Sequence, residues 1–247
     1  MHSLYANVLN ETHKLFRQKR TKLALLLTVL APVLSAVLLD SFHSNTGIFF
    51  GRDFTLLMLG LFSTVFLPLF LFMTAADSFA GEVAARTLKN VLVQPIARSK
   101  IFASKVIAIT VFTAALLAIV WLVSLLAGLV FVGGITWRGL ADSLTAYPAA
   151  FVSMTAVGMA AVFVAQWFRS GVGAFALCVF LYIAAKLLPF IFPQMAAWSI
   201  FSYTDWHMLW IGNAASFGRL FNAFVFLLSS CIITYTAGWY LFEKKQI

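Results

Sequence analysis

Six long apolar stretches, separated by polar segments, dominate the sequence. They cover residues 23–39, 54–76, 106–132, 146–168, 172–192 and 220–242. Their lengths lie around the roughly 20 helical residues that cross a hydrocarbon core of about 30 Å. Because hydrocarbon offers the backbone no hydrogen-bond partners, only helices or closed barrels cross it, and unbroken apolar runs favour helices. The pattern predicts an all-α membrane protein with six transmembrane helices.

The basic residues predict the orientation of these helices, because Lys and Arg favour cytoplasmic loops. Of the seventeen, thirteen lie before the first span, between the second and third spans, at Arg169 and after the last span. The loops on the other side hold only Arg52, Arg138 and Arg219. We therefore expect a multi-pass protein of the cell membrane with both termini in the cytoplasm.

The composition supports a membrane protein. Hydrophobic residues make up 62% of the 247 residues and charged residues 10%, whereas soluble domains are about half apolar and one-quarter charged. The net charge of +9 is scattered between apolar blocks, so we expect membrane lipid as a partner and no nucleic acid. Cys178 and Cys231 lie within apolar runs, where a thiol acts as a small hydrophobe, and we expect no disulfide or metal site. No linker rich in Pro, Gly or Ser interrupts the chain, so residues 1–247 are taken as one domain.

The segment 1–22, before the first span, combines apolar and basic residues at helical spacing. Leu4, Val8 and Leu15 fall toward one side, and Lys14 and Arg17 fall toward the other. This pattern is typical of an amphipathic helix that lies in the membrane surface. The alternative is a soluble tail that contains a few apolar residues.

The loop between the second and third spans, residues 77–105, carries a second amphipathic pattern. Its apolar positions can form one stripe on a helix: Phe79, Val83, Leu88, Val91 and Leu92. Polar side chains point elsewhere, and Pro95 disfavours helical geometry in the residue before it. We predict a short cytoplasmic helix parallel to the membrane, then a break and the basic start of the third span. The alternative is that this loop is basic only because it is cytoplasmic.

This loop resembles that of the ABC-2 family of transporter permeases, which carry a GE pair, a short spacer, TL, then LxxPI or LxxPV, an Arg and a Lys. The matching residues are Gly81, Glu82, Thr87, Leu88, Leu92, Pro95, Ile96, Arg98 and Lys105. The resemblance extends along most of the chain. It implies a single domain with an interface helix (1–22), two spans (23–76), a coupling loop (77–105), three spans (106–192), an outer re-entrant segment (193–219), and a last span and tail (220–247).

The resemblance also implies how the chain works. A coupling helix would insert into a cleft of a separate ATPase subunit, and its candidate contacts are Gly81, Glu82, Arg86, Thr87, Lys89 and Asn90. Two such ATPases, holding ATP and Mg, would join this chain and a second, identical or similar permease. The chain itself would bind no cofactor and would not be an enzyme, and its sequence contains no P-loop, HExxH motif or nucleophile elbow. The expected role is bacterial export of a hydrophobic or amphipathic substrate, such as a lipid-like molecule, a drug or an antimicrobial peptide.

The outer segment 193–219 is too apolar for a free loop and too often interrupted for a seventh span. Its aromatic residues include Trp198, Phe201, Trp206 and Trp210, and glycines break it. We predict short helices that dip back into the outer leaflet, and these four aromatic residues are candidates for an outer gate. The alternative is a plain interfacial cap.

Charged residues within the spans bear on other functions. Lys186 is the one charge deep in a span, roughly 21 Å from the inner boundary at about 1.5 Å per residue. It either extends to the outer surface or lines the translocation path. All eight acidic residues lie at span ends or in loops, which disfavours an ion-coupled secondary transporter. A membrane-embedded enzyme would need a cluster of ionisable groups at one membrane face, and the sequence indicates none. These two functions remain the alternatives.

Overall fold

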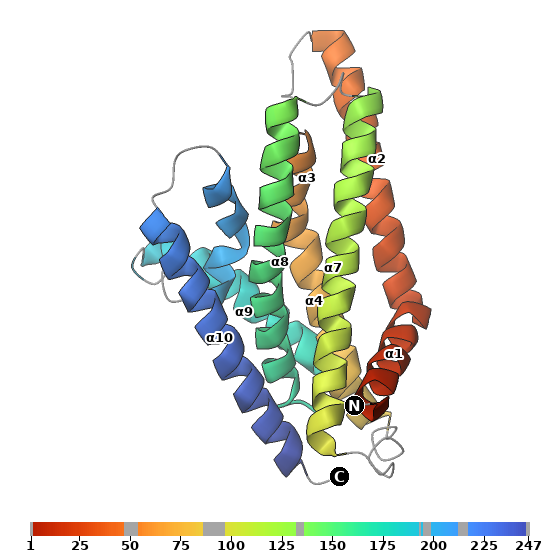
Figure 1. The fold of residues 1–247 in the computed structure, drawn as a ribbon, viewed down its shortest axis with the longest axis vertical. Helices are drawn as coiled ribbons and strands as arrows, with labels where there is room; N and C mark the ends of the chain where they lie inside the picture. Colours follow the sequence, from red (N-terminus) through yellow and green to blue (C-terminus); the bar gives the residue numbers. More distant parts are fainter. Residues whose placement is uncertain are drawn as a thin grey trace.

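The computed structural model describes residues 2–46, 54–85, 97–131, 136–192, 194, 199–211 and 217–245. These residues form helices and contain no strand, and six of the helices are long and apolar enough to cross a membrane (Figure 1). The predicted all-α fold with six spans is therefore confirmed. The two ends of the chain lie at the same end of the bundle (Figure 1), as two cytoplasmic termini require.

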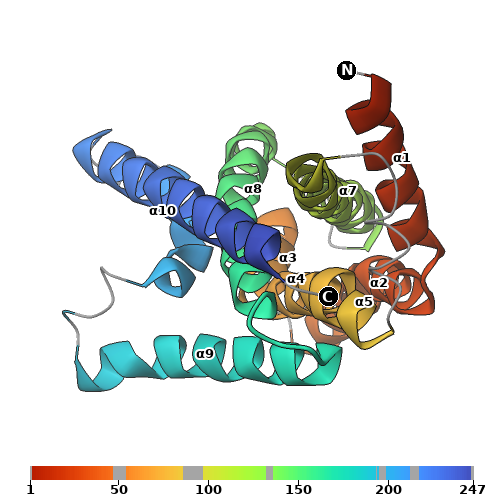
Figure 2. The ribbon, with the colours of Figure 1, turned by 90° about the horizontal axis from the view of Figure 1, so that it is seen from below.

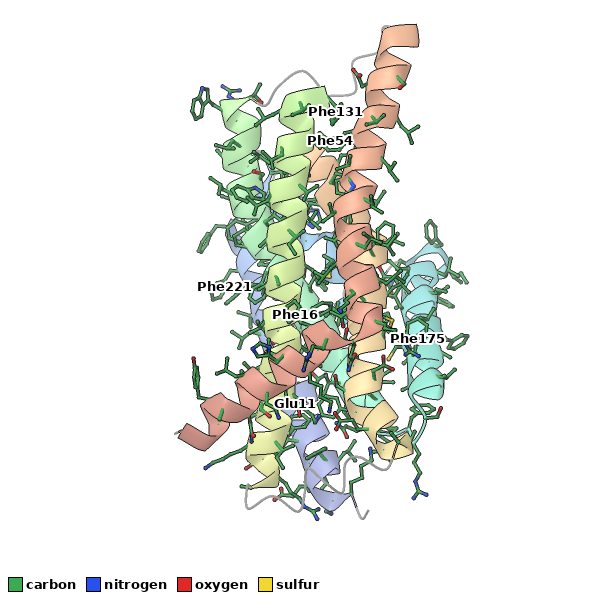
Figure 3. The ribbon with its side chains drawn as sticks, turned by 90° about the vertical axis from the view of Figure 1, so that its right-hand side faces the viewer. Glu11, Phe16, Phe54, Phe131, Phe175 and Phe221 are labelled. Atoms are coloured by element: carbon green, nitrogen blue, oxygen red, sulfur yellow. The ribbon has the colours of Figure 1, made fainter. Side chains whose placement is uncertain are left out.

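The first two helices are joined by a bend at Gln18. Helix α1 (His2–Arg17) lies obliquely across the lower part of the bundle, whereas α2 (Lys19–Thr46) runs along it as the first span (Figure 3). Leu15 is buried, and the ring of Phe16 lies edge-on to Phe112 of α7 (Arg98–Phe131), 6.0 Å between centroids. The end of the apolar side of α1 therefore packs on the protein, whereas Tyr5 and Leu9 are exposed. The predicted contact of α1 with the membrane surface stays a prediction.

The second span is one continuous helix, Phe54–Ala84, that contains two π-helical segments. It comprises α3 (Phe54–Leu61), η1 (Phe62–Phe66), α4 (Leu67–Ala76), η2 (Asp77–Gly81) and α5 (Glu82–Ala84). Seen from the end that carries the C-terminus, it lies at the centre of the bundle (Figure 2). Such π-helical turns are rare and occur frequently at functional sites.

The span ends differ from the predicted ones on the side of the termini. The second span continues past residue 76 because Ser78, Phe79 and Ala80 are still buried, and the third begins at Arg98 instead of residue 106. Phe79 and Val83 therefore belong to the spanning helix and not to a separate coupling helix. The rest of the predicted coupling helix, residues 86–96, lies outside the described residues.

The remaining spans are α8 (Trp137–Ala165), α9 (Gly171–Ile191) and α10 (Phe217–Lys244). Helix α8 packs on α4, α7 and α10, whereas α9 lies along one side of the bundle against α4 (Figure 2). The 3₁₀ helix η4 (Ile200–Trp210) packs on α8 and contacts α9 and α10. Among the six spans, α9 and α10 are the least buried.

Candidate functional site

Four charged side chains from three elements meet at the end of the bundle that carries the termini. Lys105 of α7 donates to Glu82 of α5 at 2.6 Å and to both carboxylate oxygens of Glu11 at 3.2 Å. Lys14, one turn after Glu11 on α1, donates to the same Glu82 oxygen at 2.5 Å. We call these four residues the ionic cluster. It ties α1, the end of the second span and the start of the third span to one another.

The centre of the ionic cluster is buried. Lys105 is 1% exposed and Glu82 is 6% exposed. A buried charge is tolerated only when it is paired and hydrogen-bonded, and here two ammonium groups balance two carboxylates. Removing one partner of such a pair typically costs about 3–5 kcal/mol, because it leaves an uncompensated charge in the interior. The ionic cluster therefore fixes the relative positions of the three elements.

The environment of Lys14 keeps it charged. Burial on its own would lower the pKa of this ammonium, but the hydrogen bond and charge of Glu82, with the charge of Glu11, outweigh it and raise the pKa above 10.5. Lys14 is therefore protonated at any physiological pH.

A second ion pair lies at the start of η2. Nη1 of Arg20 in α2 contacts both carboxylate oxygens of Asp77, at 2.7 and 2.8 Å. The first residue of α9, Gly171, lies so close that a Cβ there would be 3.5 Å from Oδ1 of Asp77 and from Cα of Gly81. Contacts with α2 and α9 thus fix η2, and the ionic cluster fixes α5, which follows η2 directly in the chain.

The start of α7 is also anchored. Arg98 donates to the backbone oxygens of Glu243, at 3.0 Å, and Lys245, at 3.4 Å. One turn further on, Phe102 packs on Phe79, 5.6 Å between ring centroids, and on Phe242, 5.7 Å. Both chain segments that flank residues 86–96 are therefore fixed to the bundle, one by the ionic cluster and the other by α10.

The structure describes only part of the predicted coupling site. Gly81 ends the π-helical segment η2 and Glu82 is the first residue of α5. The other candidate contacts, Arg86, Thr87, Lys89 and Asn90, lie outside the described residues. The role of all six in binding an ATPase stays a prediction. Because Glu82 is buried, it can affect a partner protein only indirectly, through Lys14 and Lys105, to which it is bonded.

The sequence pattern did not predict the ionic cluster. The expectation that no ionisable groups gather at one membrane face is wrong. The pairs join residues 68 and 94 positions apart, so the sequence order does not bring them together. One signal was available. Lys105 is flanked by apolar residues on both sides along a helical period, and a buried ammonium at that position requires carboxylate partners.

Toward the other end of the bundle, a smaller polar group surrounds Lys186. Its ammonium donates to Oδ2 of Asp205 at 3.0 Å and to Oγ1 of Thr204 at 2.6 Å, both in η4. The hydroxyl of Tyr182, one turn earlier on α9, donates to the backbone oxygen of Thr64 at 2.5 Å. Thr64 in turn donates to Oδ1 of Asp205 at 3.3 Å. Lys186 is thus ion-paired, and this group joins α9, η4 and the π-helical segment η1.

The four aromatic candidates for an outer gate separate into two places. The ring of Phe201 lies edge-on to Tyr182, 5.6 Å between centroids, and to Phe72 of α4, 6.1 Å. Trp206 is buried on the α8 side and lies 5.5 Å from Trp210. Trp198 lies outside the described residues. Phe201 alone of the three described ones packs beside the Lys186 group.

The described residues offer no group of three His, Cys, Asp or Glu side chains that could hold a metal ion. Both carboxylates of the ionic cluster accept from ammonium groups, so they face cations that belong to the protein itself.

Comparison with protein families gives a match over most of the chain. The model of an ABC-2 family transporter protein matches residues 8–185, which is more than half of the chain and runs from within α1 to within α9. A search of curated proteins finds no match. The matched region contains the ionic cluster, η1, η2, the first four spans and α9 up to residue 185.

Proposed function

The chain belongs to the ABC-2 family of transporter proteins, and we propose that it is the permease subunit of an ATP-driven exporter. Such a permease is a multi-pass membrane protein that depends on a separate ATPase subunit. The sequence contains no P-loop, so ATP and Mg would be bound by that partner. We infer the orientation from the thirteen basic residues on the side of the termini, which faces the cytoplasm in this proposal.

The observation that carries the proposal is the ionic cluster beside the coupling segment. Glu82 lies four residues before Arg86, the first of the predicted ATPase contacts outside the described residues. Through Lys14 and Lys105 it holds α1 and α7. A force that an ATPase exerts on residues 86–96 would therefore reach three elements together. We propose that this arrangement converts closure of the ATPases into movement of the spans.

We propose two copies of the ATPase and a second permease, identical or similar, as the complete assembly. The family resemblance implies that the pathway forms between two such halves. The low burial of α9 and α10 within one chain agrees with further contacts to lipid or protein. The substrate in this proposal is hydrophobic or amphipathic, because the described spans contain few charges and the buried Lys105 and Glu82 are paired with each other.

We further propose that the Lys186 group belongs to the outer gate. Its ion pair joins α9 to η4, and its hydrogen bonds reach η1 in the middle of the second span. Because π-helical turns such as η1 occur frequently at functional sites, the contact with Thr64 is a suitable place for a movement of α9 and η4. Export would then require the Lys186–Asp205 pair to open.

One observation favours a different function. The ionic cluster provides ionisable groups at one membrane face, which a lipid-acting enzyme or an ion-coupled transporter would need. However, its carboxylates are paired with lysines, and Glu82 has almost no contact with solvent. A general base or an ion site must be reached by substrate or ion. We therefore assign the ionic cluster to structure and coupling.

Co-purification tests the proposed function. We expect the tagged full chain, solubilised from native membranes, to retain a protein with a P-loop and a vanadate-sensitive ATPase activity. Replacing residues 86–96 by a Gly/Ser linker of equal length should remove both, whereas the matched substitution Lys244→Gln at the other end of the sequence should not. Absence of a nucleotide-binding protein, or its full retention by the linker variant, would contradict the proposal.

A further inference from the structure

Two apolar grooves lie next to each other on the face formed by α7, α8, η4 and α10. The larger, about 550 Å³, lies between α8, η4 and α10, and is lined among others by Trp210 and Phe221. The smaller, about 360 Å³, lies between α7 and α8, and is lined among others by Trp121. Leu144 and Pro148 of α8 line both. These two residues thus form a ridge with one groove on each side.

The chemistry of the grooves selects an apolar occupant. Most of the lining atoms are carbon, and the polar groups near the smaller groove already have partners. The indole N–H of Trp121 donates to Ser143 at 3.2 Å, and the hydroxyl of Tyr147 donates to the backbone of Thr55 at 3.1 Å. A polar ligand would find no hydrogen bonds there to replace those that it has in water. Two separate furrows fit two hydrocarbon chains.

The position of the two grooves in the fold makes them accessible to membrane lipid. The grooves involve the first halves of α8 and α10, at the end of the spans opposite the termini. Leu144 and Phe221 are exposed on these spanning helices. An apolar surface of this size on a spanning helix faces the acyl region of the bilayer or another membrane protein. In the proposed orientation, this is the outer leaflet.

A basic residue beside the larger groove, Arg219, favours an anionic headgroup. Arg138 lies in the first turn of α8 and Arg219 in the first turn of α10. Both are exposed, and neither forms an ion pair with any residue that the structure describes. Asp142 is the one acidic residue in the first two turns of α8, and α10 has none there.

We propose that this face binds a two-chain phospholipid with an anionic headgroup from the outer leaflet. One acyl chain occupies each groove, the Leu144–Pro148 ridge lies between them, and Arg219, which lies between the lining residues Phe217 and Leu220 on α10, contacts the phosphate. Bound in this way, the lipid joins α7, α8, η4 and α10, and so covers the outer side of the bundle next to the proposed gate. This site does not depend on the ATPase partner.

Native mass spectrometry of the purified full chain in detergent tests the proposal. The probes are dioleoyl phosphatidylglycerol, dioleoyl phosphatidylcholine and the single-chain lyso-phosphatidylglycerol. We expect the dioleoyl phosphatidylglycerol to bind best. Arg219→Gln should weaken its binding about fivefold, the factor that corresponds to one basic residue near an anionic headgroup, and should weaken phosphatidylcholine binding less, because the choline ammonium offsets the charge of that phosphate.

Leu144→Trp tests the two grooves. The larger side chain at the ridge should reduce occupancy by both dioleoyl lipids about tenfold and affect the single-chain lipid less, because one groove can stay open. Ile233→Trp, at an exposed position of α10 outside both grooves, is the matched control and should bind like the unaltered chain. Equal affinity for one-chain and two-chain phosphatidylglycerol, or equal loss in Leu144→Trp and Ile233→Trp, would overturn the proposal. If Leu144→Trp does not fold, the comparison of lipids and Arg219→Gln still decide it.

Discussion

The ammonium of Lys105 lies 2.6 Å from the carboxylate of Glu82, and both side chains are almost completely buried. Lys105 begins the apolar part of the third span, and Glu82 lies near the end of the second span. Their contact therefore joins the two helices that flank residues 86–96. Glu11 and Lys14 add α1 to the same contact. The predicted coupling segment therefore emerges from a fixed base and not from two free helix ends.

Removal of the Glu82 carboxylate should destabilise the protein strongly. In Glu82→Gln the buried Lys105 keeps only Glu11, so we expect a loss of about 3–5 kcal/mol, the cost of breaking a buried ion pair. The thermal midpoint of the detergent-solubilised chain, followed by size-exclusion chromatography, measures this. Arg20→Gln is the matched control at an exposed ion pair and should cost at most about 1 kcal/mol. A Glu82→Gln midpoint equal to that of Arg20→Gln would contradict the structural role of the ionic cluster.

Replacing both buried partners separates stability from coupling. The double variant Glu82→Leu with Lys105→Met removes both charges and keeps similar volumes, so its stability should return close to that of the unaltered chain. The link between α5 and α7 would then be apolar and adaptable. We expect ATP hydrolysis by the reconstituted transporter to persist while substrate moved per ATP falls. Full transport per ATP in a stable double variant would show that the ionic cluster is dispensable for coupling.

The contribution of Lys14 should be lost in alkali. Its pKa is raised in the folded protein, so the charged form binds Glu82 and the stabilisation is fully present below the unfolded value of 10.5. The stabilisation is lost as the pH rises through the higher folded value. Thermal midpoints of the unaltered chain and Lys14→Met should therefore differ by a constant amount from pH 6 to pH 9 and converge above about pH 10.5. A difference that already shrinks between pH 6 and pH 8 would contradict this assignment.

The ion pair of Lys186 and Asp205 should control leakage more than stability. Both side chains are partly exposed, so the pair adds at most about 1 kcal/mol. If it holds the outer gate closed, Lys186→Met and Asp205→Asn should each raise ATP-independent efflux of substrate from proteoliposomes. Lys186→Arg keeps the charge and should not. Unchanged efflux and transport in Lys186→Met would remove the residue from the gate.

The spans were predictable from the sequence, whereas the contacts between them were not. Apolar length determines each span locally, so residues 172–192 predicted α9 almost to the residue. The helix ends beyond the apolar runs depend on tertiary burial, as Phe79 shows, and the partners of Lys105 lie up to 94 positions away. Lys186 was singled out as an isolated charge, but its partner Asp205 lies in a segment without regular periodicity. The hydrophobic pattern predicted neither of the two π-helical segments, η1 and η2.

Packing around Phe102 gives a last prediction, on α10. A Cβ added at Gly238 would lie 3.3 Å from Cζ of Phe102, which is closer than most Cβ contacts. Phe102 cannot move away easily, since it is fully buried and packs on Phe79, Tyr235 and Phe242. Gly238→Ala should therefore destabilise the protein by about 1–3 kcal/mol, the usual cost of overpacking, despite the better helix propensity of Ala.

Gly218 is the matched control for Gly238, because it lies in the same helix. Nothing lies within 4 Å of a Cβ added there, so Gly218→Ala should be neutral or stabilising by up to about 1 kcal/mol. Thermal midpoints of the two variants should thus move in opposite directions. Should Gly238→Ala be as stable as Gly218→Ala, Phe102 must have room to shift, and the anchor between α10 and the start of α7 would be looser than the aromatic contacts imply. Because that anchor and the ionic cluster flank residues 86–96, a loose anchor would leave the ionic cluster alone to transmit movement from the ATPase.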